Sequence, residues 1–407
     1  MNYFSAGGLK LFDVVVIGAG PVGSYAAYRL AEMGCKVVVL EQRDKLGGKV
    51  CCTGIIGQEC VDSFAIDDNV ILRRLNSAKL FSPSGGWLRL WRRESQACII
   101  DRAAFDVALA ERAQVKGAEY LLNSLAKDIE VRSDKVRIKV ACQDRGLNLE
   151  AKAAIVATGF GSGLVERLGL GGVGDFIMGA QTEMEAKAID EVEVYFGQEI
   201  APGFFAWLVP ISSNRVRLGL LSRRSPGLYL RKLMSSLQVQ GRVVSADAEL
   251  SYGGIPLKPL SRTYCDRVIV VGDAAGQVKP TTGGGIYYGL LCAEVAADTL
   301  HRALENNALS ARSLAGYQRE WKRKLGRELK LGYWARKFYE RLNDQQIDKI
   351  FDIIRDNGIA EALLKAEDLS FDWHSEAVLR LLGYRAVSAA LDLLKIPFRL
   401  TRGRVNV

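Results

Sequence analysis

The sequence predicts an α/β protein in which a Rossmann-type domain carries an inserted, mostly antiparallel β-sheet and is followed by a C-terminal helical region. Three observations predict this architecture. A strand, a glycine-rich turn and a helix succeed one another at the N-terminus, a second such unit follows residue 267, and alternating strands lie between them. Because 407 residues exceed what one hydrophobic core usually supports, we expect two or three sub-domains.

The composition excludes several classes of protein. Hydrophobic residues make up 49% and charged residues 25% of the chain, which is typical of a folded globular protein. No apolar run of about eighteen residues and no secretory signal occurs, so we expect a cytoplasmic protein that does not span a membrane. Eight cysteines without a CxxC pair predict reduced thiols, and two isolated histidines predict no metal site.

The N-terminal unit predicts a dinucleotide-binding turn. Residues 12–17 (FDVVVI) are a β-branched run that ends in GAGPVG at 18–23, and helical spacing continues from 24 to 33. A second strand at 36–40 delivers Glu41, where a carboxylate can accept both hydroxyls of an adenosine ribose. The alternative is a glycine-rich turn of an unrelated α/β protein. The residues expected to bind the nucleotide are Gly18, Gly20, Pro21, Gly23, Glu41 and Gln42.

The second unit distinguishes FAD from NAD. Residues 267–271 form a strand that ends in GDAAG at 272–276, and TTGGG at 281–285 opens a helix to about residue 304. Asp273 can hold a ribityl or pyrophosphate-side group, while amides at the helix start face the isoalloxazine. The alternative is that Asp273 only caps the helix. The residues expected to contact the cofactor here are Gly272, Asp273, Gly283, Gly284, Gly285 and Ile286.

The inserted segment predicts an antiparallel sheet. Strand-like alternation occurs at 176–185, 191–196, 205–210 and 215–221, and a hairpin at 79–81 and 87–91 is expected to join it. Phe204, Phe205 and Trp207 either line an apolar channel or pack the sheet. The expected boundaries are 10–60, 99–171 and 256–304 for the FAD-binding domain, 61–98 and 172–255 for the sheet domain, and 305–407 for the helical region.

The C-terminal region contains a basic amphipathic segment. Residues 312–341 carry ten Lys or Arg against three Glu, interleaved with aromatic side chains. Such a helix either lies on an anionic membrane surface or packs its apolar stripe on the FAD-binding domain. Further helices are expected at 350–355, 359–365 and 377–394, without chemistry of their own. No nucleic-acid-binding module accompanies the basic residues, so we expect no nucleic-acid partner.

Taken together, the motifs resemble the p-hydroxybenzoate hydroxylase superfamily of flavoproteins and, within it, the geranylgeranyl reductase family. The resemblance covers about residues 12–304. It rests on GAGPVG, Glu41, KVCCTGI at 49–55, the Arg102 and Asp106 pair of DRAAFD, GFFAWLVP at 203–210 and GDAAGQVKPTTGGGI at 272–286. The resemblance implies an FAD enzyme that saturates isolated double bonds of a polyprenyl chain on a lipid, diphosphate, chlorin or quinone.

The resemblance also implies roles for individual residues. Cys51 or Cys52 is the implied catalytic group, with a purely structural role for both as the alternative. Arg102 is implied at the cofactor, and Phe204, Phe205, Trp207 and Pro210 at the substrate. Many relatives carry an aspartate where this chain has Thr158, which leaves the reductant open between a ferredoxin-like protein and NAD(P)H.

Two rival functions fit the same scaffold. One is an FAD-dependent aromatic monooxygenase, which needs a polar aromatic pocket. The other is a flavin-containing protein that binds polyprenyl lipid or transfers electrons without catalysis.

Overall fold

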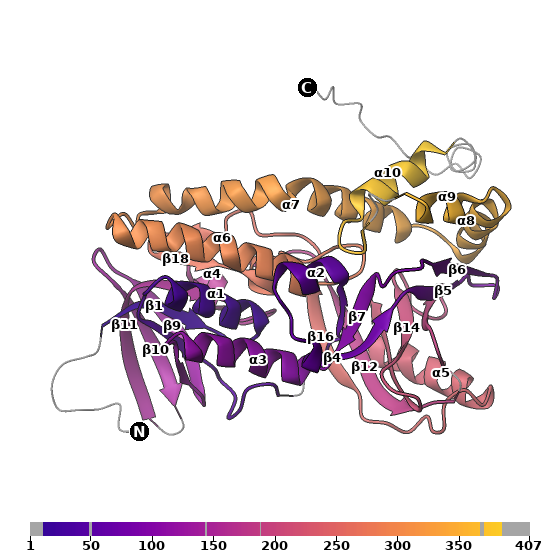
Figure 1. The fold of residues 1–407 in the computed structure, drawn as a ribbon, viewed down its shortest axis with the longest axis horizontal. Helices are drawn as coiled ribbons and strands as arrows, with labels where there is room; N and C mark the ends of the chain where they lie inside the picture. The colour runs from indigo at the N-terminus through magenta and orange to yellow at the C-terminus, as the bar shows by residue number, and fades with distance from the viewer. Residues whose placement is uncertain (1–10, 49–50, 143–144, 188, 367–369, 385–407) are drawn as a thin grey trace.

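In the computed structural model, the chain forms two halves that a long helix connects (Figure 1). The structure describes residues 11–48, 51–142, 145–187, 189–366 and 370–384. Lys49 and Val50 of the KVCCTGI motif, and residues 385–394 of the last predicted helix, lie outside these ranges.

An eight-stranded sheet forms the centre of the first half. Its strands are β1 (Phe12–Ile17), β2 (Val37–Leu40), β8 (Glu119–Leu121), β9 (Ser124–Val131), β10 (Val136–Cys142), β11 (Arg145–Val156), β17 (Tyr264–Cys265) and β18 (Val268–Val270). Strand β1 pairs in parallel with β2 and β11, and β11 pairs in parallel with β18. The two predicted dinucleotide strands, β1 and β18, therefore end at the same edge of one sheet.

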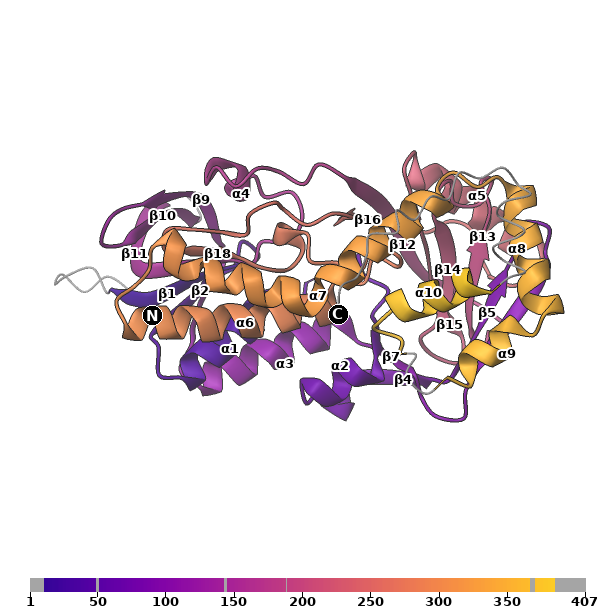
Figure 2. The ribbon, with the colours of Figure 1, turned by 90° about the horizontal axis from the view of Figure 1, so that it is seen from above.

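Side chains of β1 alternate between two buried layers. Val14 and Val16 pack against helices α1 (Pro21–Glu32), α3 (Arg102–Val115) and α6 (Ile286–Glu305), which lie together on one face (Figure 2). Val15 and Ile17 pack against the antiparallel strands β9 and β10. Burial on both faces explains why this strand is a continuous β-branched run. Helix α1 begins at Pro21, before the predicted residue 24, because proline suits the first helical position.

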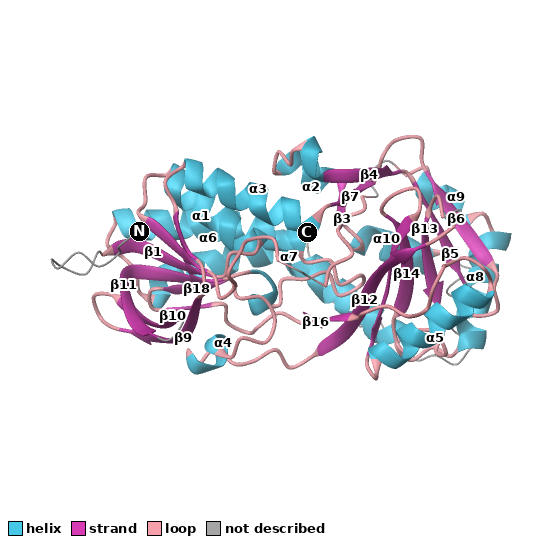
Figure 3. Ribbon diagram, turned by 90° about the horizontal axis from the view of Figure 1, so that it is seen from below, coloured by secondary structure: helices cyan, strands magenta, loops and turns pink. Residues whose placement is uncertain are grey.

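A seven-stranded sheet forms the second half (Figure 3). In order across the sheet, its strands are β16 (Ser251–Pro256), β12 (Phe176–Glu185), β15 (Arg215–Ser222), β14 (Phe205–Pro210), β13 (Val192–Phe196), β5 (Ser77–Phe81) and β6 (Trp87–Trp91). The predicted hairpin does join the sheet, through parallel pairing of β5 with β13. Helix α5 (Pro226–Val239), which sequence reasoning missed, covers one face with Leu230 and Met234.

A third, three-stranded sheet lies between the halves. It consists of β3 (Ile55–Gly57), β7 (Ala97–Ile100) and β4 (Ile71–Leu75). Strand β4 belongs to the 61–98 excursion but pairs with β7 in this sheet, not with the seven-stranded one. Strand β7 crosses the expected boundary at residue 98, and β16 crosses the one at residue 255.

The long helix α7 (Ala311–Tyr339) is the predicted basic amphipathic segment. Its apolar stripe is inside the protein: Trp321 is 1% exposed, Leu325 and Leu329 are buried in the core with α6, and the Trp321 indole donates to Thr263 Oγ1 at 3.0 Å. Further along, Tyr333 donates to Asp175 Oδ2 at 2.8 Å. Of the two alternatives for this helix, packing on the FAD-binding domain is the one that the structure contains.

Smaller elements complete the fold. They are helices α2 (Gln58–Ser63), α4 (Leu164–Arg167), α8 (Asp344–Asp356), α9 (Ile359–Leu364) and α10 (Ser375–Gly383), and the 3-10 turns Asp68–Val70 and Gly272–Ala275. Helices α8, α9 and α10 lie over the seven-stranded sheet (Figure 2). None of the described helices is apolar over a length that could cross a bilayer.

Replacing Trp321 by Ala should destabilise the protein by about 3–5 kcal/mol, since a large buried ring and its hydrogen bond are lost together. Replacing Trp334, on the same helix but 62% exposed, by Ala should change stability by no more than about 0.5 kcal/mol. Urea unfolding followed by circular dichroism measures both. Equal effects of the two substitutions would contradict the packing described for α7.

Candidate functional site

A cavity of about 1300 Å³ connects the two halves. It runs from the turn between β1 and α1 to the space between the seven-stranded sheet and helices α8 to α10. Nearly all the residues predicted to hold a dinucleotide line it. They are Gly18, Gly20, Pro21, Glu41, Gln42, Arg102, Gly272, Asp273, Gly283, Gly284, Gly285 and Ile286.

The first glycine turn requires its glycines. Gly18 has φ +107°, and a Cβ there would lie 2.4 Å from the Ala157 carbonyl oxygen. A Cβ on Gly23 would lie 1.9 Å from the Gly18 carbonyl oxygen, so Gly23 serves the packing of α1 on the sheet and does not line the cavity. A Cβ on Gly20 would meet no atom within 4 Å, which leaves space for a ligand at this turn.

The carboxylate of Glu41 is fixed beside this turn. Its Oε2 accepts a hydrogen bond from the Ala19 amide at 3.0 Å, and its Oε1 accepts one from the Arg43 amide at 3.0 Å. Helix α1 has no side-chain cap, so amides at its N-terminus remain available to a diphosphate. The turn, the helix start and Glu41 therefore fit the adenosine diphosphate part of a dinucleotide.

The two glycine turns are held against each other by Val22 of α1. A Cβ on Gly289 of α6 would lie 2.5 Å from Val22 Cγ2, and a Cβ on Gly272 would lie 3.3 Å from the Val22 methyl groups. Because neither glycine has a side chain, Val22 packs directly on the second turn. The N-termini of α1 and α6 therefore open into the same cavity.

Asp273 lies at the second turn, beside the start of α6. A Cβ on Gly285 would lie 2.6 Å from Asp273 Oδ1, yet α6 has no side-chain cap hydrogen bond. The alternative that Asp273 only caps this helix therefore does not hold. Burial raises the pKa of Asp273 to about 6, partly opposed by the charge of Arg102. The Asp273 carboxylate does not cap α6 and lines the cavity. It therefore fits a cofactor with hydroxyl groups, such as the ribityl group of FAD.

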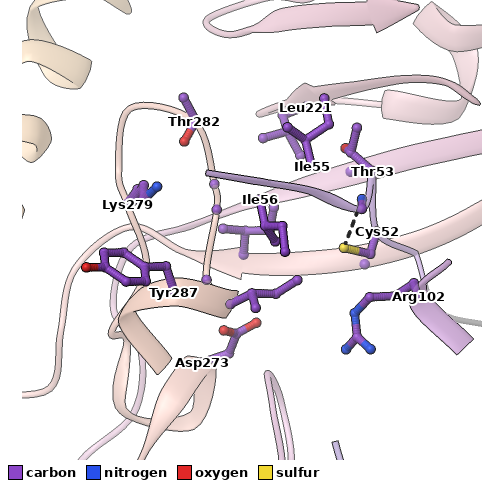
Figure 4. Close-up of a pocket in the computed structure, with 18 of the residues that line it drawn as sticks. Cys52, Thr53, Ile55, Ile56, Arg102, Leu221, Asp273, Lys279, Thr282 and Tyr287 are labelled. Carbon is purple, nitrogen blue, oxygen red and sulfur yellow. Dashed lines mark hydrogen bonds between the residues drawn. The ribbon is translucent and has the colours of Figure 1, made fainter. Parts of the chain in front are cut away.

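Arg102 lies across the cavity from Asp273 (Figure 4). It begins α3, whose N-cap Asp101 accepts from the Ala103 and Ala104 amides, and it forms an ion pair with Asp106 one turn later. Burial alone would lower the pKa of Arg102, but the negative charge of Asp106 and a contact with Cys52 raise it. The predicted pair is thus a buried cation fixed at the cofactor end of the cavity.

The two adjacent cysteines both line the cavity but have different neighbours. Cys51 lies against Gly253 of β16, and its thiol contacts the Ser251 carbonyl at 3.6 Å. Burial raises the pKa of Cys51, so it is a thiol at neutral pH. The sulfur of Cys52 instead accepts from the Gly54 amide at 3.4 Å (Figure 4).

The aromatic residues predicted at the substrate divide into two groups. Phe205 and Trp207 line the cavity, whereas Phe204 and Pro210 do not. Phe204 is completely buried, with the Arg336 guanidinium 3.8 Å above the centre of its ring. Along β14, Phe205 and Trp207 share one face, and the opposite parity of Pro210 directs it to the other.

Most of the side chains that line the cavity beyond the cysteines are apolar, with Asn76, Ser77, Arg92 and Gln96 among the exceptions. The walls of this part come from the seven-stranded sheet, which was expected to bind the substrate, and from the C-terminal helices, which were expected only to have no chemistry of their own. The apolar lining residues include Leu80, Leu88, Leu90, Val192, Val194, Phe196, Ile354, Leu363, Leu364, Val378 and Leu381. Only tertiary packing brings the helical residues among them to the site, and their spacing alone gave no signal of it.

Sequence reasoning also missed a buried ion pair between Lys279 and Asp372, both of which line the cavity. Nearby, Glu59 accepts from Tyr287 OH at 2.6 Å and from the Trp373 indole at 2.9 Å. These contacts attach residues 370–375 to the second glycine turn. A lysine inside a glycine-rich turn was the available signal, but its partner lies 93 residues away.

Replacing Gly18 by Ala should remove most of the bound flavin, because the new methyl group would push the turn away from Ala157. Gly117→Ala is a matched control: its φ is +98°, but a Cβ there meets no atom within 4 Å. Both substitutions share the left-handed strain of about 1–2 kcal/mol. Flavin absorbance per mole of purified protein should fall only in the first variant, and equal loss in both would contradict the argument.

Replacing Asp273 by Asn should stabilise the flavin-free protein at pH 7. The folded pKa of about 6 exceeds the ordinary 3.8, so the folded state binds the proton more tightly and the free energy of unfolding falls as pH rises from about 4 to 6. We expect a gain on the order of 1–3 kcal/mol at pH 7 that vanishes below pH 4. Urea unfolding at both pH values tests this, with exposed Asp44→Asn as the control.

Family profiles match two overlapping parts of the chain. The profile described as FAD dependent oxidoreductase matches residues 13–170, which include the first turn, the cysteines and Arg102. The profile described as lycopene cyclase protein matches residues 92–362, more than half of the chain. Together with the geometry of the two turns, the first match confirms FAD as the cofactor.

Named relatives match most of the chain. It is 31% identical over 352 residues to digeranylgeranylglycerophospholipid reductase of Methanocaldococcus jannaschii, covering 84% of this chain and 90% of that protein. It is 31% identical over 354 residues to digeranylgeranylglycerophospholipid reductase 2 of Methanothermobacter thermautotrophicus, covering 83% and 90%.

A solved structure confirms the predicted fold class. A geranylgeranyl bacteriochlorophyll reductase-like protein from Thermoplasma acidophilum superposes with a TM-score of 0.84 at 24% identity, covering 95% of this chain and 99% of that one. The chain also carries the lycopene cyclase protein pattern. Its extended similarity to the two reductases identifies it as an FAD-dependent oxidoreductase that belongs to the digeranylgeranylglycerophospholipid reductase family.

Proposed function

We propose that the protein saturates isolated double bonds of geranylgeranyl chains on a glycerophospholipid, using reduced FAD. The observation that carries the proposal is that one cavity joins the cofactor turns to a long apolar space. The names of the relatives support the lipid class, and lycopene is likewise an isoprenoid hydrocarbon chain. A polar aromatic substrate would be poorly matched to these walls, which disfavours the monooxygenase alternative.

The apolar walls supply the binding energy. At about 0.8 kcal/mol per buried methylene-sized unit, a twenty-carbon chain contributes on the order of 10 kcal/mol before ordering and membrane competition are subtracted. Phe205 and Trp207 lie where such a chain passes from the sheet toward the cysteines. The chain is thereby positioned lengthwise, which brings a double bond to the cofactor and excludes water from it.

Bound and reduced FAD supplies the hydride for this chemistry. Asp273 and Arg102 would hold the cofactor from opposite sides of the cavity, with the glycine turns at its diphosphate. An unactivated alkene also needs a proton and has no carbonyl to take up charge. We assign this role to the Cys51 thiol, which is protonated at neutral pH and lies on the cavity wall, with Cys52 as the second candidate.

The reductant of the flavin is proposed to be a ferredoxin-like protein. Thr158 stands where the family resemblance implies an aspartate in many members, and its hydroxyl donates to Ser162 Oγ at 2.8 Å on the cavity wall. Without that carboxylate, direct reduction by NAD(P)H is the weaker alternative. Anaerobic bleaching of the flavin by NADPH at a rate sufficient for turnover would reverse this preference.

Because the proposed substrate is a membrane lipid, the protein is proposed to work at an anionic membrane surface. The sequence predicts residues 312–341 for this contact. In the structure, α7 exposes Trp334 and several basic side chains, whereas Trp321, Leu325 and Leu329 are buried. Its contribution would be mainly electrostatic.

The proposed reaction is tested by anaerobic incubation of dithionite-reduced holoprotein with a panel of unsaturated polyprenyl compounds. The panel includes a glycerophospholipid, a diphosphate, a chlorin and a quinone. Mass spectrometry should detect gains of two hydrogens per reduced bond in the glycerophospholipid. Oxygen uptake with an oxygenated aromatic product would favour a monooxygenase, and tight lipid binding without any mass change would favour a non-catalytic protein.

Replacing Cys51 by Ala should slow alkene reduction by about 100-fold or more, which is the usual contribution of a proton-transfer group. Flavin content and lipid binding should stay unchanged, so the loss would appear in kcat. Cys142→Ala is the control, because that free cysteine does not line the cavity. Unchanged turnover in the Cys51→Ala, Cys52→Ala double variant would refute a catalytic role for either thiol.

A further inference from the structure

Strand β6 is at once a wall of the cavity and part of the outer surface. Its side chains alternate in the way that strands impose. Leu88 and Leu90 line the apolar part of the cavity, while Trp87, Arg89 and Trp91 are exposed, and Trp91, at the end of the strand, also borders the cavity. The strand is the last of the seven-stranded sheet, at the outer edge of the molecule (Figure 3).

The outer face of β6 exposes unusually large apolar side chains. Trp87 is 53% and Trp91 52% exposed, and they are four residues apart on the same face of one strand. Tryptophan is enriched where a protein meets the headgroup level of a bilayer, since its ring is apolar and its N–H is polar. Two such rings on a sheet edge form a candidate contact surface.

The segment that carries these rings is basic. Residues 71–93 contain six basic side chains and no acidic one. The basic residues are Arg73, Arg74, Lys79, Arg89, Arg92 and Arg93. Asp68 pairs with Arg74, Glu191 pairs with Arg89 and Lys79, and Asp348 accepts hydrogen bonds from Ser82 and Ser84, so the six basic side chains of the segment outnumber these three acidic neighbours. This surface is complementary to anionic lipid headgroups.

The apolar part of the cavity reaches the surface beside Trp91. A residue that is exposed and also lines the cavity marks a point where the cavity meets solvent. The lining residues that are also exposed include Gln42, Arg43, Ser162, Thr282, Phe371 and Trp91, so the cavity meets solvent at several points, and Trp91 marks the one on β6. A hydrocarbon chain that entered next to Trp91 would pass directly between Leu88 and Leu90 of β6 and the C-terminal helices.

We propose that the segment 71–93 docks on an anionic bilayer, with Trp87 and Trp91 at headgroup depth, and that a lipid chain enters the cavity beside Trp91. The contact with the bilayer does not depend on the proposed function, whereas the identity of the entering lipid rests on it. The segment differs from residues 312–341, whose apolar stripe is buried. Its exposed rings adjoin a mouth of the cavity, and those of α7 do not line the cavity.

The test compares two matched variants of the holoprotein: Trp87→Ser with Trp91→Ser, and Trp334→Ser, which removes the exposed ring of α7. Each is sedimented with vesicles of phosphatidylglycerol and phosphatidylcholine mixed at several ratios. We expect the wild type to bind increasingly with phosphatidylglycerol content, the first variant to bind at least tenfold more weakly, and Trp334→Ser to bind like the wild type. Since all three rings are exposed, folding should be preserved, and bound-flavin absorbance checks it.

A second measurement separates docking from catalysis. Reduction of a detergent-solubilised polyprenyl glycerophospholipid should be unchanged in the Trp87→Ser single variant, because the Trp87 ring does not line the cavity, while reduction of the same lipid in vesicles should fall at least threefold. The docking proposal is overturned if the wild type does not sediment with anionic vesicles, or if vesicle binding is lost in Trp334→Ser and not in the Trp87→Ser, Trp91→Ser variant. An absence of reduction in detergent by the wild type would overturn the proposed function and leave the docking result intact.

Discussion

The packing of Val22 of α1 on Gly272 and Gly289 is the contact on which the site depends. It allows the N-termini of two helices, far apart in sequence, to open into one space. A side chain at either glycine would separate the two turns, and neither turn alone encloses a dinucleotide. The cofactor end of the cavity is therefore defined by backbone proximity, and the side chains of Glu41, Asp273 and Arg102 complete it.

The rest of the cavity depends on a different kind of contact, between parts of the chain that share no local motif. The ion pair between Lys279 and Asp372 and the hydrogen bonds of Glu59 attach the segment 370–375 to the second turn. The C-terminal helices then cover the inner face of the β-sheet and turn an open surface into an enclosed apolar space. The cofactor end, with its charged side chains, and the mainly apolar end thus come from different regions of the sequence.

What the sequence could predict follows from this division. Strands β12 and β14 have the bounds that alternation predicts, and both glycine turns lie where their spacing placed them, because these features are local. The pairing of Asp372 with Lys279 and the contribution of α8 to α10 were missed, because no local pattern encodes a contact across 93 residues. Strand parity could have separated Trp207 from Pro210. The amphipathic pattern of α7 was correctly identified, but periodicity cannot reveal what covers an apolar stripe.

Helix α7 has a mechanical consequence for the enzyme. It is anchored in the first half through Trp321 and in the second through Arg336, which lies over Phe204, and through the Tyr339 hydroxyl, which donates to the Phe204 carbonyl. Because α7 contacts both halves, it opposes their separation. A long hydrocarbon chain would then have to enter the cavity end first. With one cofactor and a chain that can slide along the cavity, the depth of insertion would decide which double bond is reduced. Several double bonds could be reduced in turn before the lipid dissociates.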